Sequence, residues 1–175
     1  AEQVLNSKLA IKQEIDNIPT DFGSDISSLS RPKFNVAIQE RFVSKEYDRQ
    51  PLVFDAPKDP SANMDFLTER IGIEVCFGHP SFIGIDLIKF QADSHSDVDK
   101  IDVGIYIVTP RNFQMQMKID YKQKWRGSLA YEKVVRYLSH LRSVYTRSHL
   151  RNRNNFMKVC MMLDGYQTME WRDKK

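Results

Sequence analysis

Apolar residues alternate with polar or small ones from Ile71 to Phe77, and this period of two predicts a β-strand. The apolar side chains share one face, so Glu74 and Cys76 point from the other. Residues 65–70, directly before, complete a predicted β-hairpin. A charge inside an apolar strand costs free energy. Glu74 is therefore a candidate functional residue.

Helices are predicted on both sides of this hairpin. Residues 1–20 are expected to form one amphipathic helix that ends at Pro19, on the spacing of Val4, Ile11, Ile15 and Ile18. A second helix is predicted from residue 34 to about residue 47. Residues 131–145 have the clearest helical spacing in the chain. Residues 82–90 fit a helix or a strand.

The remaining apolar runs predict strands. Residues 101–108 are almost continuously apolar, as in a buried central strand. Residues 113–119 alternate and predict another strand or an extended arm, and residues 156–163 predict a final strand. Strands that alternate with helices imply an α/β fold, with a mixed central sheet flanked by helices on both faces. With no linker or repeat, we expect one domain over residues 1–175.

The composition is that of an ordinary globular protein. It is 41% hydrophobic and 28% charged, and no apolar run approaches the roughly 18 residues of a membrane-spanning helix. The first residues, Ala-Glu-Gln, do not form a basic and then apolar signal segment. Two cysteines are best explained as reduced thiols. These observations predict a cytoplasmic protein with no membrane contact.

Charge is distributed unevenly along the chain. Residues 1–110 contain 11 Lys and Arg against 18 Asp and Glu, whereas residues 111–175 contain 15 against 5. The two parts can attract each other in the folded protein. A basic surface for a polyanion is the better explanation, because residues 147–155 are rich in side chains that bind phosphate.

Asp65 and Glu74 are candidate metal ligands. The hairpin would bring an acid from its turn region near an acid on a rigid strand. Mg²⁺ is commonly held by one or two carboxylates, waters and substrate phosphates. Each acid also has a plain structural explanation, as a turn residue or a surface-facing strand position.

Four segments in order carry a resemblance to a known family. The spacing of Asp65, Glu74 and a third position resembles the active site of the PD-(D/E)xK nucleases, and in particular the BglII/BamHI-like type II restriction endonucleases. The hairpin and the turn that follows resemble that family's catalytic strand, and three further segments resemble its neighbouring elements: residues 35–47, 103–110 and 129–138.

The resemblance implies a function. It implies a homodimer that hydrolyses double-stranded DNA at a short palindromic site, in a bacterium or archaeon. Mg²⁺, with Mn²⁺ as a substitute, would be held by Asp65, Glu74 and the main-chain carbonyl of Val75. The metal would supply Lewis acidity and orient the attacking water. The resemblance also favours a helix for residues 82–90.

Cys76 departs from the family pattern. The catalytic set carried over is Asp65, Glu74 and Cys76, but this third position is commonly Lys in the wider family, and Gln or Glu in similar enzymes. A thiol is a poor hydrogen-bonding substitute and a poor partner for Mg²⁺. Lys89 or Gln91 can supply the missing function, or the metal can suffice without it. The third reading is a catalytically inactive DNA-binding relative on the same scaffold.

The resemblance and the charges also suggest DNA contacts. Base-reading positions are expected in the turn after the catalytic strand and before the helix at residue 131, and phosphate contacts are expected at lysines and arginines nearby. These residues are Gly78, His79, Arg126 and Gly127 for bases, and Lys122, Lys124, Arg151 and Arg153 for phosphates. A repair nuclease that recognises DNA structure and a non-enzymatic structural dimer remain as rival functions.

Overall fold

The computed structural model describes residues 2–18, 30–52, 63–95, 100–125, 130–145, 156–161 and 169–170. These residues form helices, strands and one 3-10 turn in alternation: α1 (Glu2–Ser7), α2 (Leu9–Asn17), α3 (Arg31–Ser44), β1 (Asp48–Arg49), β2 (Phe66–Thr68), β3 (Ile71–Val75), η3 (Pro80–Phe82), α4 (Ile83–His95), β4 (Val103–Val108), α5 (Arg111–Ile119), α6 (Tyr131–Tyr145), β5 (Phe156–Met161) and β6 (Met169–Glu170). No helix among them is both long and apolar enough to cross a bilayer.

The described strands form one mixed sheet whose spatial order follows the chain from β1 to β6. Strands β3, β4 and β5 run parallel, and the pairs at each edge are antiparallel. Parallel neighbours need a crossover, which α4 supplies between β3 and β4. All six residues of β4 are buried. The predicted mixed sheet and its buried central strand are confirmed.

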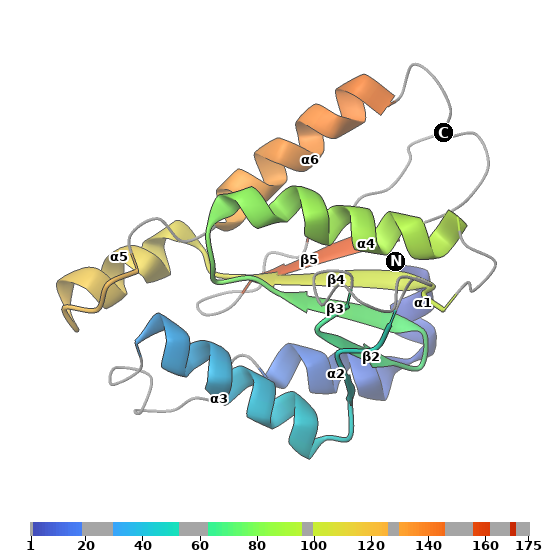
Figure 1. Cartoon of the computed structure of the whole chain (residues 1–175), viewed down its shortest axis with the longest axis horizontal. Coiled ribbons are helices and arrows are strands. Elements are labelled where there is room, and N and C mark those ends of the chain that lie inside the picture. The colour runs from blue at the N-terminus through green and yellow to red at the C-terminus, as the bar shows by residue number, and fades with distance from the viewer. Residues whose placement is uncertain are drawn as a thin grey trace.

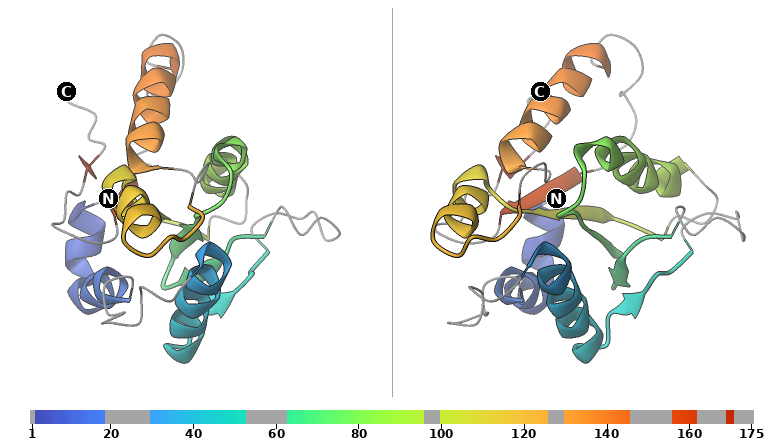
Figure 2. Two further views of the ribbon diagram at one scale, coloured as in Figure 1. Left: turned by 90° about the vertical axis from the view of Figure 1, so that its left-hand side faces the viewer. Right: turned by 60° about the vertical axis from the view of Figure 1, so that its left-hand side comes forward.

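Helices cover both faces of this sheet. Helices α4 and α6 lie over one face, and α2 and α3 lie under the other (Figure 1). The turned views keep the same layers apart (Figure 2). The helix predicted over residues 131–145 is present as α6. The helix predicted from residue 34 to about residue 47 is present as α3, which begins at Arg31 and already ends at Ser44. Residues 82–90 fall in η3 and α4, as the resemblance favoured.

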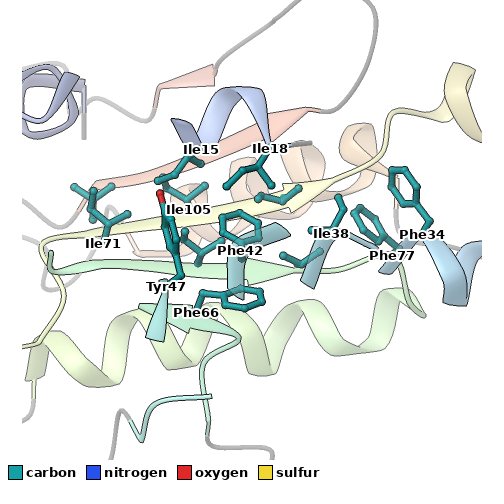
Figure 3. Close-up of a cluster of buried hydrophobic side chains, with 14 of the residues drawn as sticks. Ile15, Ile18, Phe34, Ile38, Phe42, Tyr47, Phe66, Ile71, Phe77 and Ile105 are labelled. Carbon is teal, nitrogen blue, oxygen red and sulfur yellow. The ribbon is translucent and has the colours of Figure 1, made fainter. Parts of the chain in front are cut away.

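An aromatic cluster fills the lower face. Phe34, Ile38 and Phe42 recur at four-residue spacing on α3 and point together towards the sheet (Figure 3). The Phe34 ring lies 5.0 Å from the Phe77 ring and 5.4 Å from the Trp125 ring, measured between centroids. Such spacings favour tilted and edge-to-face aromatic contacts. This packing fixes the apolar face of β3.

The prediction of a strand or extended arm over residues 113–119 is wrong, because this segment forms helix α5. Alternating apolar residues at positions 113, 115, 117 and 119 also satisfy a four-residue repeat. The helix buries Phe113 and Met117, and it exposes Met115 and Ile119. Methionine is a strong helix former, so intrinsic preference and tertiary packing agree on the helix.

Two boundary predictions also need correction. The N-terminal helix is divided into α1 and α2 by a break at Lys8, whose backbone N–H bonds back to the Leu5 carbonyl. Strand β5 ends at Met161, within the predicted range of residues 156–163. It is not the final strand, because β6 pairs with it further along the chain.

Gly104 on β4 lets α4 approach the sheet closely. A Cβ atom at this position would lie 2.6 Å from the Phe90 ring of α4. We expect Gly104→Ala to lower the free energy of unfolding by about 1–3 kcal/mol, because the ring must move out of a packed core. Denaturant unfolding measures this change. Gly84→Ala is the matched control, since its Cβ would meet only the Tyr137 hydroxyl at 3.7 Å. Equal stability of the two variants would contradict the prediction.

Candidate active site

A tight turn sets the register of the β2–β3 hairpin. Glu69 and Arg70 both have positive φ, at 40° and 65°, as in the two-residue turns that join antiparallel strands. Neither is glycine, so neighbouring contacts must support the turn. Arg70 pairs with Asp102 at 2.8 Å, and the Lys8 ammonium donates to the Glu69 carbonyl.

This register brings Asp65 and Glu74 together. Phe66 pairs with Ile73, so one further step along the two strands places Asp65 opposite Glu74. The backbone N–H of Val75 donates to Asp65 Oδ2 at 2.8 Å. Directly opposed side chains on antiparallel strands have Cβ atoms about 5 Å apart. The structure thus holds the two predicted acids side by side, with one oxygen of Asp65 fixed.

The face that carries Glu74 is buried. Period-two geometry predicted that Glu74 would point away from the apolar core, and it does, but helix α4 covers it and leaves only 3% of the residue exposed. The Lys89 ammonium of α4 donates to Glu74 Oε1 at 3.0 Å. It also lies 3.5 Å from Asp86 Oδ1, one helical turn earlier. The surface-facing explanation for Glu74 is therefore wrong.

Tyr106 extends this cluster onto the central strand. It is the register partner of Glu74 on β4, and its hydroxyl donates to Asp86 Oδ2 at 2.7 Å. Cys76 lies on the same face of the sheet and its thiol hydrogen-bonds with Tyr106. Burial raises the pKa of Cys76 above its ordinary value, so this side chain stays a neutral thiol.

Burial and mutual repulsion raise the pKa values of the two acids. Removal from water, followed by the nearby charge of Asp65, raises the pKa of Glu74 to about 9. Burial also raises the pKa of Asp65, against the opposing effect of the Val75 N–H. Burial disfavours the charge of Lys89, but the surrounding carboxylates, Glu74 first, outweigh it and raise its pKa.

The cluster holds more acids than cations. Among the described residues, the carboxyl groups of Glu74, Asp86 and the half-buried Asp65 lie near one ammonium, that of Lys89. The raised pKa of Glu74 means that this acid holds a proton in the metal-free protein. A divalent cation beside Asp65 and Glu74 can replace that proton, with the adjacent Val75 carbonyl as a third oxygen donor. In the described ranges no three His, Cys, Asp or Glu side chains are grouped to hold a metal. A site of two carboxylates, one carbonyl and several waters suits Mg²⁺, because this ion usually keeps part of its water shell in proteins.

The predicted DNA contacts are only partly described. The turn after β3 contains Gly78 and the exposed His79, whose Nδ1 accepts from the Ser81 N–H at 3.3 Å. Lys122 and Lys124 follow α5 and are exposed, Lys122 with a φ of 53°. Outside the described residues lie Arg126, Gly127, Arg151 and Arg153, and the side chain of Gln91 is likewise not described.

Sequence reasoning missed Asp86 and Tyr106. Both carried a signal, since Asp86 interrupts the apolar run Ile83–Phe90 and Tyr106 adds a hydroxyl to a fully buried strand. Buried polar groups of this kind need hydrogen-bond partners. Only the fold shows that the two are each other's partners.

Comparison with known proteins identifies the family. The family model described as "Restriction endonuclease BglII/BglIII" matches residues 1–146 of the 175. The chain belongs to this family. The restriction endonuclease family resemblance is thereby confirmed, and with it membership of a family of DNA endonucleases. No curated protein matches the sequence.

Two solved structures are similar to this BglII family member. The crystal structure of restriction endonuclease BglII complexed with a DNA 16-mer matches with a TM-score of 0.51 and 15% identity, over 81% of this chain and 71% of that one. The crystal structure of free BglII matches with a TM-score of 0.48 and 16% identity, over 97% of this chain and 88% of that one. The first match supports the restriction-endonuclease-like α/β core.

Proposed function

We propose that the protein is a Mg²⁺-dependent type II restriction endonuclease that hydrolyses double-stranded DNA at a short palindromic site. The observation that carries the proposal is the placement of Asp65 opposite Glu74, in a cluster where three carboxyl groups lie near one ammonium. The family match supports the reaction class. One domain that includes all 175 residues would perform it, in the cytoplasm of a bacterium or archaeon.

The chain's own residues prepare the site for a metal and a phosphate. Asp65, Glu74 and the Val75 carbonyl would hold Mg²⁺, or Mn²⁺ in its place. The bound ion would supply Lewis acidity and offset the charge of the scissile phosphate. The Val75 N–H fixes Asp65, and α4 excludes bulk water from Glu74. A water-poor site strengthens each of these electrostatic interactions.

DNA would lie along the basic C-terminal part of the chain. Exposed Lys122 and Lys124 would contact phosphates, and so would Arg151 and Arg153. Gly78 and His79 follow the strand that carries the acids and would contact base edges, and the same role is proposed for Arg126 and Gly127. Phosphate contacts of this kind make binding strongly dependent on salt.

A homodimer would address both strands of a palindrome, and the outer face of α4 favours it. Ile85 and Ile88 are 46% and 60% exposed there, one helical turn apart. We expect Ile88→Glu to halve the molecular mass measured by light scattering, because a charge would be buried at the interface. Ile119→Glu is the matched control, since Ile119 is 69% exposed on α5. A wild-type monomer, or an Ile88→Glu dimer of unchanged affinity, would contradict this interface.

The rival function is an inactive DNA-binding relative. One observation favours it, because Cys76 is buried against Tyr106 and offers no charged or strongly polar group to a reacting water. The lysine that contacts Glu74 argues for activity. Both proteins would bind DNA, so only cleavage separates them.

The deciding experiment is digestion of a sequenced phage genome with the purified protein and Mg²⁺, or Mn²⁺, followed by sequencing of the ends. A discrete set of fragments whose ends share a palindrome is expected. A smear would indicate a nuclease without sequence preference. Intact DNA that is nevertheless bound in a salt-dependent way would establish the inactive relative.

A further inference from the structure

The position of Lys89 accounts for the missing third group of the active site. The third position of the active-site pattern, after Asp65 and Glu74, is Cys76. Its thiol hydrogen-bonds with Tyr106, and the residue is 7% exposed. Lys89 comes from a different element, helix α4, yet its ammonium reaches the same carboxylate, Glu74, at 3.0 Å. No other lysine or arginine of the described ranges contacts Asp65 or Glu74.

Lys89 is held in place rather than free to swing into solvent. It is 7% exposed, and its ammonium forms an ion pair at 3.5 Å with Asp86, one turn earlier on α4. Asp86 is itself fixed by the Tyr106 hydroxyl at 2.7 Å, and Tyr106 stands beside Glu74 on the neighbouring strand. This closed set of contacts fixes the ammonium relative to the metal-binding acids, as preorganised catalysis requires.

We propose that Lys89 is the catalytic lysine of this endonuclease, that it contacts the attacking water from α4 in place of a residue at position 76, and that Asp86 and Tyr106 are its positioning residues. This inference rests on the proposed function. An ammonium has three protons, and its contacts with Glu74 and Asp86 use two of them. The third can be donated to the water oxygen.

The reaction then balances with one water for each bond broken. The water oxygen forms a bond to phosphorus while the bond from phosphorus to the leaving ester oxygen breaks. The proton lost by the water passes to solvent, and the leaving oxygen takes a proton from solvent. The Lys89 ammonium keeps its protons and stabilises the negative charge that develops on the attacking oxygen.

Three variants and a control test the proposal. Lys89→Met removes the charge, Lys89→Arg keeps it in a different shape, and Tyr106→Phe removes the support of Asp86 but leaves the contact between Lys89 and Glu74. Lys45→Met is the matched control, because Lys45 is 54% exposed and pairs with Glu14. Each is measured by cleavage of a plasmid with Mg²⁺ under single-turnover and steady-state conditions at several pH values, by DNA affinity in EDTA, and by the thermal unfolding midpoint.

We expect Lys89→Met to slow cleavage by about 10²–10³-fold, the usual effect of removing one donor that stabilises a developing negative charge, with DNA affinity unchanged. Lys89→Arg should be faster than Lys89→Met. Tyr106→Phe should lower kcat without raising KM, and its rate should respond to pH differently from that of wild type. Lys45→Met should cleave at the wild-type rate. A role for Lys89 in stability alone would leave kcat and its pH profile unchanged in Tyr106→Phe.

The outcomes separate the inference from the function on which it rests. Cleavage by wild type and by Lys89→Met at equal rates would overturn the inference and leave the endonuclease intact. If Lys89→Met does not fold, Tyr106→Phe decides, and a wild-type kcat and pH profile there would overturn the inference. A wild type that binds DNA but never cuts it would overturn both.

Discussion

Asp65→Asn and Glu74→Gln should each reduce the rate of DNA cleavage by about 10³-fold or more. Each change keeps the shape of the side chain but removes one of the two acids that the hairpin register brings together. A catalytic metal contributes several kcal/mol of transition-state stabilisation, which corresponds to this factor. Single-turnover digestion of a plasmid with saturating Mg²⁺ measures it.

The same variants should bind DNA in EDTA at least as tightly as wild type, because neither change adds negative charge near the phosphates. Asp102→Asn is the matched control. Asp102 is an acid beside the same hairpin, but it is partly exposed and pairs with Arg70 at 2.8 Å. It should cut at the wild-type rate. Normal cleavage by either Asp65→Asn or Glu74→Gln would remove the acid pair from the mechanism.

Without metal, the protein should become less stable as pH rises from about 5 to about 9. Burial and Asp65 raise the folded-state pKa of Glu74 to about 9, from an ordinary value of 4.5. Between these values the folded state holds a proton that the unfolded state has lost, so the free energy of unfolding falls with pH. One such proton contributes at most about 1.4 kcal/mol per pH unit.

Glu74→Gln should flatten this dependence, because a neutral amide does not titrate. Denaturant unfolding in EDTA at several pH values measures both slopes. Mg²⁺ should stabilise wild type more at high pH than at low pH, because the metal replaces the proton on Glu74. It should have a much smaller effect on Glu74→Gln. Parallel curves for the two proteins would show that Glu74 does not titrate in this range.

Much of the fold follows from local patterns in the sequence. The strand that begins at residue 71 and the helix Tyr131–Tyr145 were each predicted from one dominant periodicity, and the central strand was predicted from a continuous apolar run. The first of these strands ends at Val75, two residues before the predicted end. Helix α5 was not, because apolar residues at every second position also fit a four-residue repeat. Whether the segment forms a helix or a strand depends on which of its side chains can be buried. Phe113 and Met117 pack in one cluster with Phe34 and Trp125 only in the folded chain.

The active site was predictable only where its residues are close in the sequence. Asp65 and Glu74 belong to one hairpin, so spacing alone could pair them. Lys89 was a candidate in the sequence, but its contact with Glu74 depends on the angle at which α4 crosses the sheet. Gly104 permits that close crossing, since any side chain there would meet Phe90. Tyr106 and Asp86 are 20 residues apart, and only the packing of β4 under α4 joins them.

The two sides of helix α4 link the active site to the proposed dimer interface. Its inner side presents Lys89 to Glu74, and its outer side presents Ile85 and Ile88 to solvent. If a second subunit docks on that outer side, the assembled pair supports the helix from both sides. Dilution below the pairing affinity would then loosen the lysine and slow scission together. Such coupling would restrain isolated subunits from nicking one strand of a chromosome.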